Sequence, residues 1–200
     1  MKTIIKSIAT LLTIVIVIST TAFAADKKDQ TATVVSEAAN FSKIEVRGNV
    51  EVYLTDGEAN NVKVYSNYYG ESAMVQNQNG TLRIASYTKE KLVVYVTVAE
   101  LYSLSAYDNA VVKSDKQLSA INLDVNLYNN ATAQLKLEAF TANININDRA
   151  KADLSGNVNQ CVLLQNQSST VNSTEFVAGH LTKKVNGIVT ASNDTELAVI

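Results

Sequence analysis

The chain has 200 residues and a formal net charge of −2, from 17 lysines and arginines against 19 aspartates and glutamates. This length permits one domain with a substantial core, and the slightly acidic balance excludes the basic surface with which proteins bind nucleic acid. Cys161 is the only cysteine, so no disulfide can form within the chain. The absence of proline suits a protein that is strand for most of its length.

Residues 1–24 have the three parts of a secretory signal peptide. Lys2 and Lys6 give a positive start, an apolar run follows over Ile8–Ile18, and Ala22-Phe23-Ala24 fits a cleavage site. The alternative is a membrane anchor, but the apolar run is shorter than the roughly 20 residues that a span needs. We therefore expect an exported mature protein without an integral membrane span, in the periplasm, at the cell surface or outside the cell.

The segment that follows is expected to contain a linker and then a β layer. Residues 25–40 are small and polar, as in a flexible linker. Residues 41–98 alternate apolar and polar side chains, which predicts an N-terminal layer of β-hairpins that caps the first coil. Asn79-Gly80 predicts a tight hairpin turn, whereas Gly48-Asn49 is compatible with a hairpin or a coil corner. Leu92–Val98 is nearly all apolar, which predicts a strand covered on both sides.

A short pattern recurs through residues 101–200. Each copy alternates apolar and polar residues, continues with Asp, Asn or Gly, and usually has a small residue two places later. The Asp, Asn and Gly positions are Asp108, Asn129, Asp148, Asn166 and Gly187. Subtraction gives spacings of 21, 19, 18 and 21 residues. A period of about 20 is typical of proteins built from stacked supersecondary units.

The repeat predicts an all-β protein in which residues 41–200 form a single β-solenoid domain. Asp, Asn and Gly reach the left-handed backbone region at low cost, so the five repeated positions are expected to be structural corners. The apolar residues before each corner are expected to point into the core: Leu104, Ala106, Val125, Leu127, Ile144, Ile146, Val162 and Leu164. The alternative is a β-sandwich or meander, whose turns recur at roughly 8 to 12 residues.

The polar side chains between the core positions are expected to point outward in rows. One predicted row contains Tyr107, Tyr128, Asn147, Gln165 and Asn186, and a second contains Ser105, Asn126, Asn145, Leu163 and Lys184. Amides and tyrosine rings suit the hydroxyls and apolar faces of sugars. The candidate ligand-binding residues are Tyr107, Tyr128, Asn126, Asn145, Asn147, Gln165 and Asn186. The alternative is a solvated wall with stabilising amide ladders. Tyr68-Tyr69 is a second exposed aromatic candidate.

No residue set in the sequence predicts catalysis, a metal site or a cofactor. Cys161 and His180 have outward parity in neighbouring coils, but a nucleophilic pair also needs an orienting group and an oxyanion site. We expect both to be ordinary surface-strand residues. Asp108 and Asp148 are interpreted as turn residues, because the calcium-binding Gly-Gly-x-Gly-x-Asp repeat is absent.

The segments Phe41–Val52 and Gly80–Ile84, together with the repeats, resemble the head domains of auto-transporter adhesins, the GIN-type domains. The resemblance extends from Phe41 to the C-terminus and implies a right-handed parallel β-helix in exported proteins, mainly of Bacteroidetes-like bacteria. In that family the repeat commonly carries Gly-Ser-Gly, and of the matching first glycines only Gly187 is present here. The resemblance implies adhesion, but it brings no catalytic residues and no defined ligand.

We therefore expect a non-enzymatic exported adhesion or surface-interaction module that binds a glycan or a protein through its Asn/Tyr face. The first alternative is an envelope scaffold that forms a homo-oligomer through its C-terminal coil, at Leu197–Ile200. The second alternative is a carbohydrate-active enzyme on a β-helix, which would require clustered acids that the outward rows do not supply.

Overall fold

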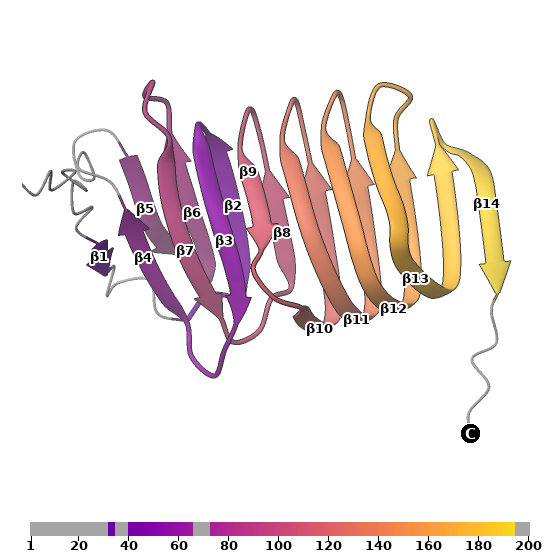
Figure 1. The fold of residues 1–200 in the computed structure, drawn as a ribbon, viewed down its shortest axis with the longest axis horizontal. Coiled ribbons are helices and arrows are strands. Elements are labelled where there is room, and N and C mark those ends of the chain that lie inside the picture. Colours follow the sequence, from indigo (N-terminus) through magenta and orange to yellow (C-terminus); the bar gives the residue numbers. More distant parts are fainter. Residues whose placement is uncertain (1–31, 35–39, 66–72, 195–200) are drawn as a thin grey trace, which may run out of the picture.

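A computed structural model describes residues 32–34, 40–65 and 73–194. These residues form an all-β fold with no helix among them (Figure 1). Several features expected from the sequence lie outside the described residues: the signal peptide at 1–24, most of the linker at 25–40, Tyr68-Tyr69 and Leu197–Ile200.

The described residues contain strands of two kinds, with long strands between residues 118 and 185 and short strands before and after them. In chain order they are β1 (Ala32–Val34), β2 (Lys43–Gly48), β3 (Val50–Asp56), β4 (Asn61–Tyr65), β5 (Ala73–Gln78), β6 (Thr81–Ser86), β7 (Leu92–Val98), β8 (Ser103–Ala106), β9 (Val111–Ser114), β10 (Leu118–Leu127), β11 (Thr132–Ile146), β12 (Lys151–Gln165), β13 (Thr170–Val185) and β14 (Ile188–Asp194).

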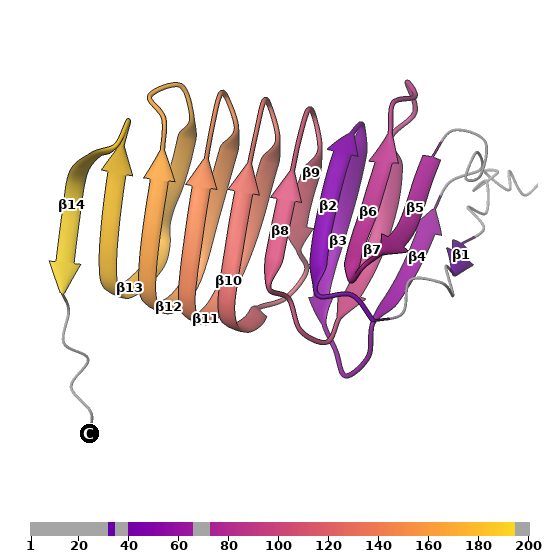
Figure 2. The ribbon, with the colours of Figure 1, turned by 180° about the vertical axis from the view of Figure 1, so that it is seen from behind.

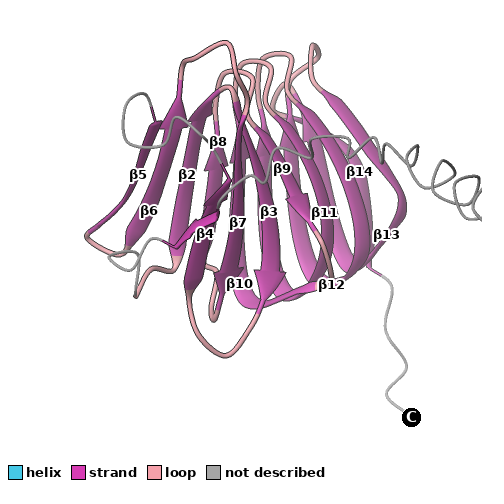
Figure 3. Ribbon diagram, turned by 60° about the vertical axis from the view of Figure 1, so that its left-hand side comes forward, coloured by secondary structure: helices cyan, strands magenta, loops and turns pink. Residues whose placement is uncertain are grey.

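All strands belong to one 14-stranded sheet in the order β1-β4-β7-β3-β9-β11-β10-β8-β2-β6-β5, and β12, β13 and β14 follow from β11. The sheet curls so that two arms face each other (Figures 1 to 3). The long strands contribute to both arms because they bend in the middle. In β11, Thr132–Gln134 pairs with β9 in one arm. Thr141–Ile146 pairs with β10 in the other arm, where β10 in turn pairs with β8.

The apolar side chains of both arms fill the space between them. The predicted core residues of the first three copies are confirmed, because each is buried: Leu104, Ala106, Val125, Leu127, Ile144 and Ile146. The prediction is wrong for the fourth copy. There Ala142 pairs with Cys161 and Ile144 with Leu163, so Cys161 and Leu163 are buried.

The error in the fourth copy is a shift of one residue. β11 and β12 pair with a constant offset of 19 residues, as from 144 to 163, whereas aligning Asn166 with Asp148 assumes 18. One residue of shift exchanges the two faces of a strand. Val162 is consequently half-buried, and Leu164 is 38% exposed on the outer surface.

The backbone of three of the expected corner residues is left-handed. Asp108, Asn129 and Asp148 have φ angles of 62°, 59° and 55°, in the left-handed region. Asn166 is different, because it has no positive φ. Its side-chain oxygen instead accepts hydrogen bonds from the backbone N–H groups of Ser168 and Ser169, at 3.2 and 2.9 Å. The fourth corner is therefore closed by a side chain.

Gly187 has the expected positive φ, 80°, but its turn is a hairpin and not a coil corner. Asn186 before it has a φ of 50°, and two successive positive φ angles favour a tight two-residue hairpin. β14 accordingly runs antiparallel to β13, with Val185 opposite Ile188. The parallel stack of the second half ends at β13.

The N-terminal layer contains one of the predicted hairpins. Asn79-Gly80 joins β5 to β6 as an antiparallel hairpin, as predicted. Gly48-Asn49 is not a hairpin turn, because β2 pairs with β6 and β8 while β3 pairs with β7 and β9. Gly48 has a φ of 81°, and a Cβ atom there would lie 2.1 Å from the Ser86 carbonyl oxygen. Only glycine fits this position.

The rest of the layer continues the parallel sheet instead of forming a separate set of hairpins. β2, β3, β6 and β7 pair in parallel with one another or with β8 and β9, whereas β4 pairs antiparallel with β7 and β5 antiparallel with β6. The expectation that Leu92–Val98 is covered on both sides is wrong, because Tyr95 is exposed on its outer face. Within the expected linker, β1 pairs antiparallel with β4.

Candidate ligand-binding face

The outer surface of the arm containing β8 and the second halves of β10 to β13 carries the predicted polar rows. Strand register places Ser105, Asn126 and Asn145 side by side. We call this line of residues, continued by Leu164 and Lys184, the central row. Leu163 was expected in it, but Leu164 occupies that position because of the one-residue shift in the fourth copy.

A second line, which we call the corner row, lies beside it just before each turn. Its members share one hydrogen-bond pattern, in which each backbone N–H donates to a backbone carbonyl of the neighbouring strand. They are Tyr107, Tyr128, Asn147, Asn166 and Asn186. Four of these residues were expected there. The prediction for Gln165 is wrong, because Gln165 pairs with Ile146 and Val185 and lies in line with the core residues.

Aromatic stacking dominates the first half of the corner row. The Tyr107 and Tyr128 rings are parallel within 6°, with centroids 4.8 Å apart. The Arg47 guanidinium lies 3.9 Å from the Tyr107 centroid. Both faces of the Tyr107 ring are therefore covered by neighbours within the protein. Tyr128 has one face against Tyr107, so its other face, toward Asn147, is the ring surface that a ligand could reach.

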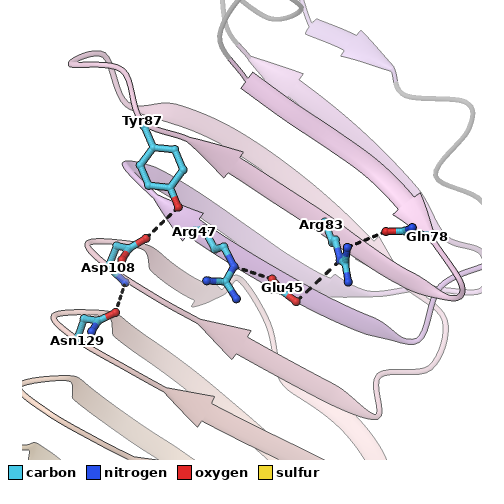
Figure 4. A network of polar contacts seen from close by, with 7 residues as sticks. All are labelled: Glu45, Arg47, Gln78, Arg83, Tyr87, Asp108 and Asn129. Atoms are coloured by element: carbon cyan, nitrogen blue, oxygen red, sulfur yellow. Dashed lines mark hydrogen bonds and ion pairs between the residues drawn. The ribbon is translucent and has the colours of Figure 1, made fainter.

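The Arg47 guanidinium that lies over Tyr107 belongs to an ion-pair network. Figure 4 shows this network. The Arg47 Nε donates to Glu45 at 2.6 Å, and this hydrogen bond raises the pKa of Arg47 above its ordinary value. The Arg83 Nε lies 4.0 Å from the second carboxylate oxygen of Glu45, and Arg83 also donates to Gln78 at 2.7 Å. Glu45 thus orients the cation that covers the Tyr107 ring.

The corner residues form a second polar chain beside this network. The Tyr87 hydroxyl donates to Asp108 at 3.3 Å, and the Asn129 side-chain oxygen accepts from the Asp108 backbone N–H at 3.2 Å (Figure 4). The Asp148 carboxylate accepts in the same way from the Asn129 backbone N–H at 2.8 Å. The Asn129 and Asp148 side chains therefore each satisfy a backbone donor of the preceding repeat, which gives them a structural role.

A groove of about 310 Å³ crosses the central row. Its lining includes Asp124, Asn126, Asn143, Asn145 and Leu164. Asn143 donates to Asp124 at 2.9 Å, which fixes one wall. Asn126 and Asn145 have no side-chain hydrogen bond to another residue within the described ranges, so their amides remain available to a ligand. The groove thus combines two amides, a carboxylate and an exposed leucine.

Cys161 and His180 do not form a pair. Gln160 lies opposite His180, and Cys161 lies opposite Leu181. His180 is exposed, whereas Cys161 is buried in the core, where burial raises the pKa of its thiol to about 12. The expectation that Cys161 points outward is wrong for the same reason as for Leu164. No group of three or more His, Cys, Asp or Glu side chains suited to a metal occurs among the described residues.

The other arm carries an aromatic cluster that the sequence analysis missed. The Tyr53 and Tyr95 rings stack at 4.8 Å, and Tyr65 meets Tyr95 edge-on at 5.1 Å. Glu51 lies beside Tyr53 and accepts from Lys113 at 2.8 Å and from Lys91 at 3.1 Å. The Lys113 hydrogen bond is the main reason that the pKa of Glu51 falls to about 2. Alternation marks Tyr53 as outward, but Tyr95 lies in a run that was expected to be covered on both sides. Only the β3–β7 register places the two rings together.

The described residues thus form an all-β domain with a polar groove on its outer face. The chain belongs to the family described as "Putative auto-transporter adhesin, head GIN domain", whose model matches residues 40–199. None of the curated proteins matches the chain. In the described part of the chain, no helix is long and apolar enough to cross a membrane.

Several solved structures have a fold similar to that of this chain. A putative adhesin from Bacteroides fragilis has a TM-score of 0.67 and 15% identity, covering 78% of this chain and 77% of that one. A putative adhesin from Parabacteroides merdae has a TM-score of 0.63 and 14% identity over 78% and 77% of the two chains. A putative lipid binding protein from Parabacteroides distasonis has a TM-score of 0.62 and 10% identity, with 78% of both chains covered. At these identities, the likeness concerns the fold alone.

Proposed function

We propose that this protein is a non-enzymatic, exported adhesion module that binds a glycan through the groove of its central row. The observation that carries the proposal is the lining of that groove, where the unpaired amides of Asn126 and Asn145 lie beside the exposed Leu164. An amide offers both donors and an acceptor to vicinal hydroxyls, and an apolar side chain suits the C–H face of a sugar.

Neighbouring groups extend this site toward the corner row. Asp124 adds a carboxylate acceptor, and Tyr128 adds one uncovered ring face. The ring faces of Tyr107 cannot stack on a sugar, because Arg47 and Tyr128 cover them. A ligand would therefore meet the edge and hydroxyl of Tyr107. An extended peptide that pairs its backbone with the same amides is the protein ligand that this groove would accept.

The proposal includes the shape and the location of the protein. We infer that the coils form a right-handed parallel β-solenoid, which the parallel pairing of β10 to β13 and the regular corners support. Export by cleavage after residue 24 is supported by the sequence pattern and by membership of an adhesin family. The burial of Cys161, away from His180, supports a binding role over a nucleophilic one.

A scaffold that self-associates through its C-terminal end is the second candidate. It is favoured by the exposed Ile188 and Val189 on β14, the strand that ends the sheet. An edge strand presents unpaired backbone groups to which another strand can add. If the protein forms a homo-oligomer and charged substitutions at Ile188 and Val189 abolish it, the scaffold function would be favoured over glycan binding.

The test is binding of the purified exported protein to an array of glycans and matrix proteins. We expect specific glycans to be retained, and the double variant Asn126→Ala/Asn145→Ala to lose them, because two ligand hydrogen bonds disappear together. Asn157→Ala, which removes an exposed amide of the other arm, is the matched control and should bind normally. Unchanged glycan binding by the double variant would refute the groove. A blank array combined with concentration-dependent assembly would favour the scaffold.

A further inference from the structure

A second exposed surface lies at the bend where each long strand passes from one arm to the other. Ile121 is 66% exposed and Phe140 is 54% exposed. The flanking pairs Ala120–Ala139 and Asn122–Thr141 show that Ile121 and Phe140 occupy the same position in consecutive coils. Two large apolar side chains thus lie side by side in contact with water. Exposed apolar surface of this kind usually marks an interaction site.

Packing of the coils does not require apolar residues at this bend. In the next two coils the equivalent positions are Asn159 and Gly179, as the flanking pairs of β11 with β12 and of β12 with β13 show. The same bend therefore forms with a polar side chain and with no side chain. Ile121 and Phe140 need an explanation other than folding.

The two residues line an open pocket of about 620 Å³. The lining also includes Glu100, Ser119, Glu138 and Asn159, and none of its residues lines the polar groove. Glu138 accepts a hydrogen bond from Gln117 at 2.6 Å, and Glu100 accepts one from the Tyr102 hydroxyl. Across the described ranges, neither glutamate has an ion-pair partner. Two carboxylates held by neutral donors therefore border the apolar surface.

We propose that this pocket binds a peptide segment in which an apolar side chain lies next to a lysine or arginine. The apolar side chain would cover Ile121 and Phe140, and the cation would pair with Glu138 or Glu100. This assignment is independent of the glycan site.

Charge complementarity selects this occupant over the others that an apolar surface could take. Anionic lipid head groups would be repelled by the two carboxylates, and a second copy of the chain carries a formal net charge of −2. A cationic apolar segment satisfies both components of the pocket at once. Peptide recognition through one apolar anchor flanked by charge pairs also requires only a small interface.

The probe is a hexapeptide, acetyl-Gly-Leu-Lys-Leu-Lys-Gly-amide, titrated into the exported protein labelled with 15N. We expect shift changes centred on Ile121, Glu138 and Phe140. Phe140→Thr should weaken binding roughly tenfold or more, because most of the apolar contact is lost. Glu138→Gln should weaken it roughly threefold and reduce its dependence on salt.

Val177→Thr is the matched control, because Val177 is 58% exposed on β13 but does not line the pocket. It should bind the peptide like the unchanged protein, and circular dichroism should show that all variants are folded. The proposal is overturned by an absence of shifts at the bend, or by equal binding of the analogue with glutamate in place of lysine. Self-association that Phe140→Thr abolishes would also overturn it, and would assign the surface to a second copy.

Discussion

The middle of the sheet and its C-terminal end are built from the same repeat but are stabilised differently. In β10 to β12 the inner positions are apolar and buried, as at Val125, Ile144 and Leu163. In β13 the residue opposite Leu163 is Lys183, and this residue, Leu181 and Val185 are only half-buried. The core therefore becomes thinner toward the end, where an antiparallel hairpin replaces the next coil. Buried apolar side chains stabilise the middle of the sheet, whereas a tight turn at Asn186-Gly187 ends the series of parallel strands.

The largest difference between the two regions should appear on truncating inner side chains. Ile144→Ala removes a fully buried side chain and should lower the free energy of unfolding by about 4 kcal/mol. Leu181→Ala, at a half-buried inner position of β13, should lower it by about 1 kcal/mol. Urea denaturation monitored by circular dichroism measures both. Equal losses at the two positions would contradict the idea that the core becomes thinner toward the end.

A third region, the paired strands β3, β7 and β9, is stabilised by ion pairs on its surface. The pKa of Glu51 is about 2, below its ordinary value of 4.5, mainly because Lys113 donates a hydrogen bond to it. A depressed pKa stabilises the folded state above pH 4.5, and this stabilisation is lost as the pH falls toward 2. Glu51→Gln should therefore lower the free energy of unfolding by about 2 kcal/mol at pH 7. This value allows for solvent screening of the ion pairs, because the lysines are partly exposed.

Urea denaturation of both proteins at several pH values between 2 and 7 checks this expectation. The difference in the free energy of unfolding should be full at pH 5 to 7 and should vanish near pH 2. A difference that does not change with pH would show that Glu51 acts through packing alone. Glu138→Gln is the control, because Glu138 has no ion pair among the described residues.

The smallest expected effect is a gain in the free energy of unfolding, at a residue on the boundary between the middle of the sheet and its C-terminal end. Gln165 occupies an inner position between Ile146 and Val185, and its buried side-chain oxygen has no hydrogen-bond partner. Gln165→Leu removes this unsatisfied acceptor and should raise the free energy of unfolding by about 1 kcal/mol. Gln134→Leu, on the exposed face of β11, should change it little. A destabilised Gln165→Leu variant would mean that Gln165 has a partner in solution.

Part of the candidate site could be predicted from the sequence, because outward positions follow from alternation. Asn126 and Asn145 were identified in this way, and the structure places them side by side in the groove. Asp124 and Leu164 in the same groove were missed. Leu164 was missed because the fourth copy was aligned one residue out of register, and Asp124 because it lies outside the repeated pattern. The covering of Tyr107 by Arg47 joins residues 60 positions apart, as 107 minus 47 shows, so no local pattern contains it.

By itself, the sequence determined the features that depend on local conformation. These are the all-β class, the alternation that buries Leu127 and Ile146, and the left-handed corners at Asp108 and Asn129. Asx residues reach that backbone region at a lower cost than most other residues do, because their short polar side chains can form hydrogen bonds with nearby backbone groups. Tertiary structure alone decided the offset between coils, the parallel pairing of β2 with β8, and the pocket at Ile121 and Phe140. Register is a property of two strands, and it is set by the apolar surface that they bury together.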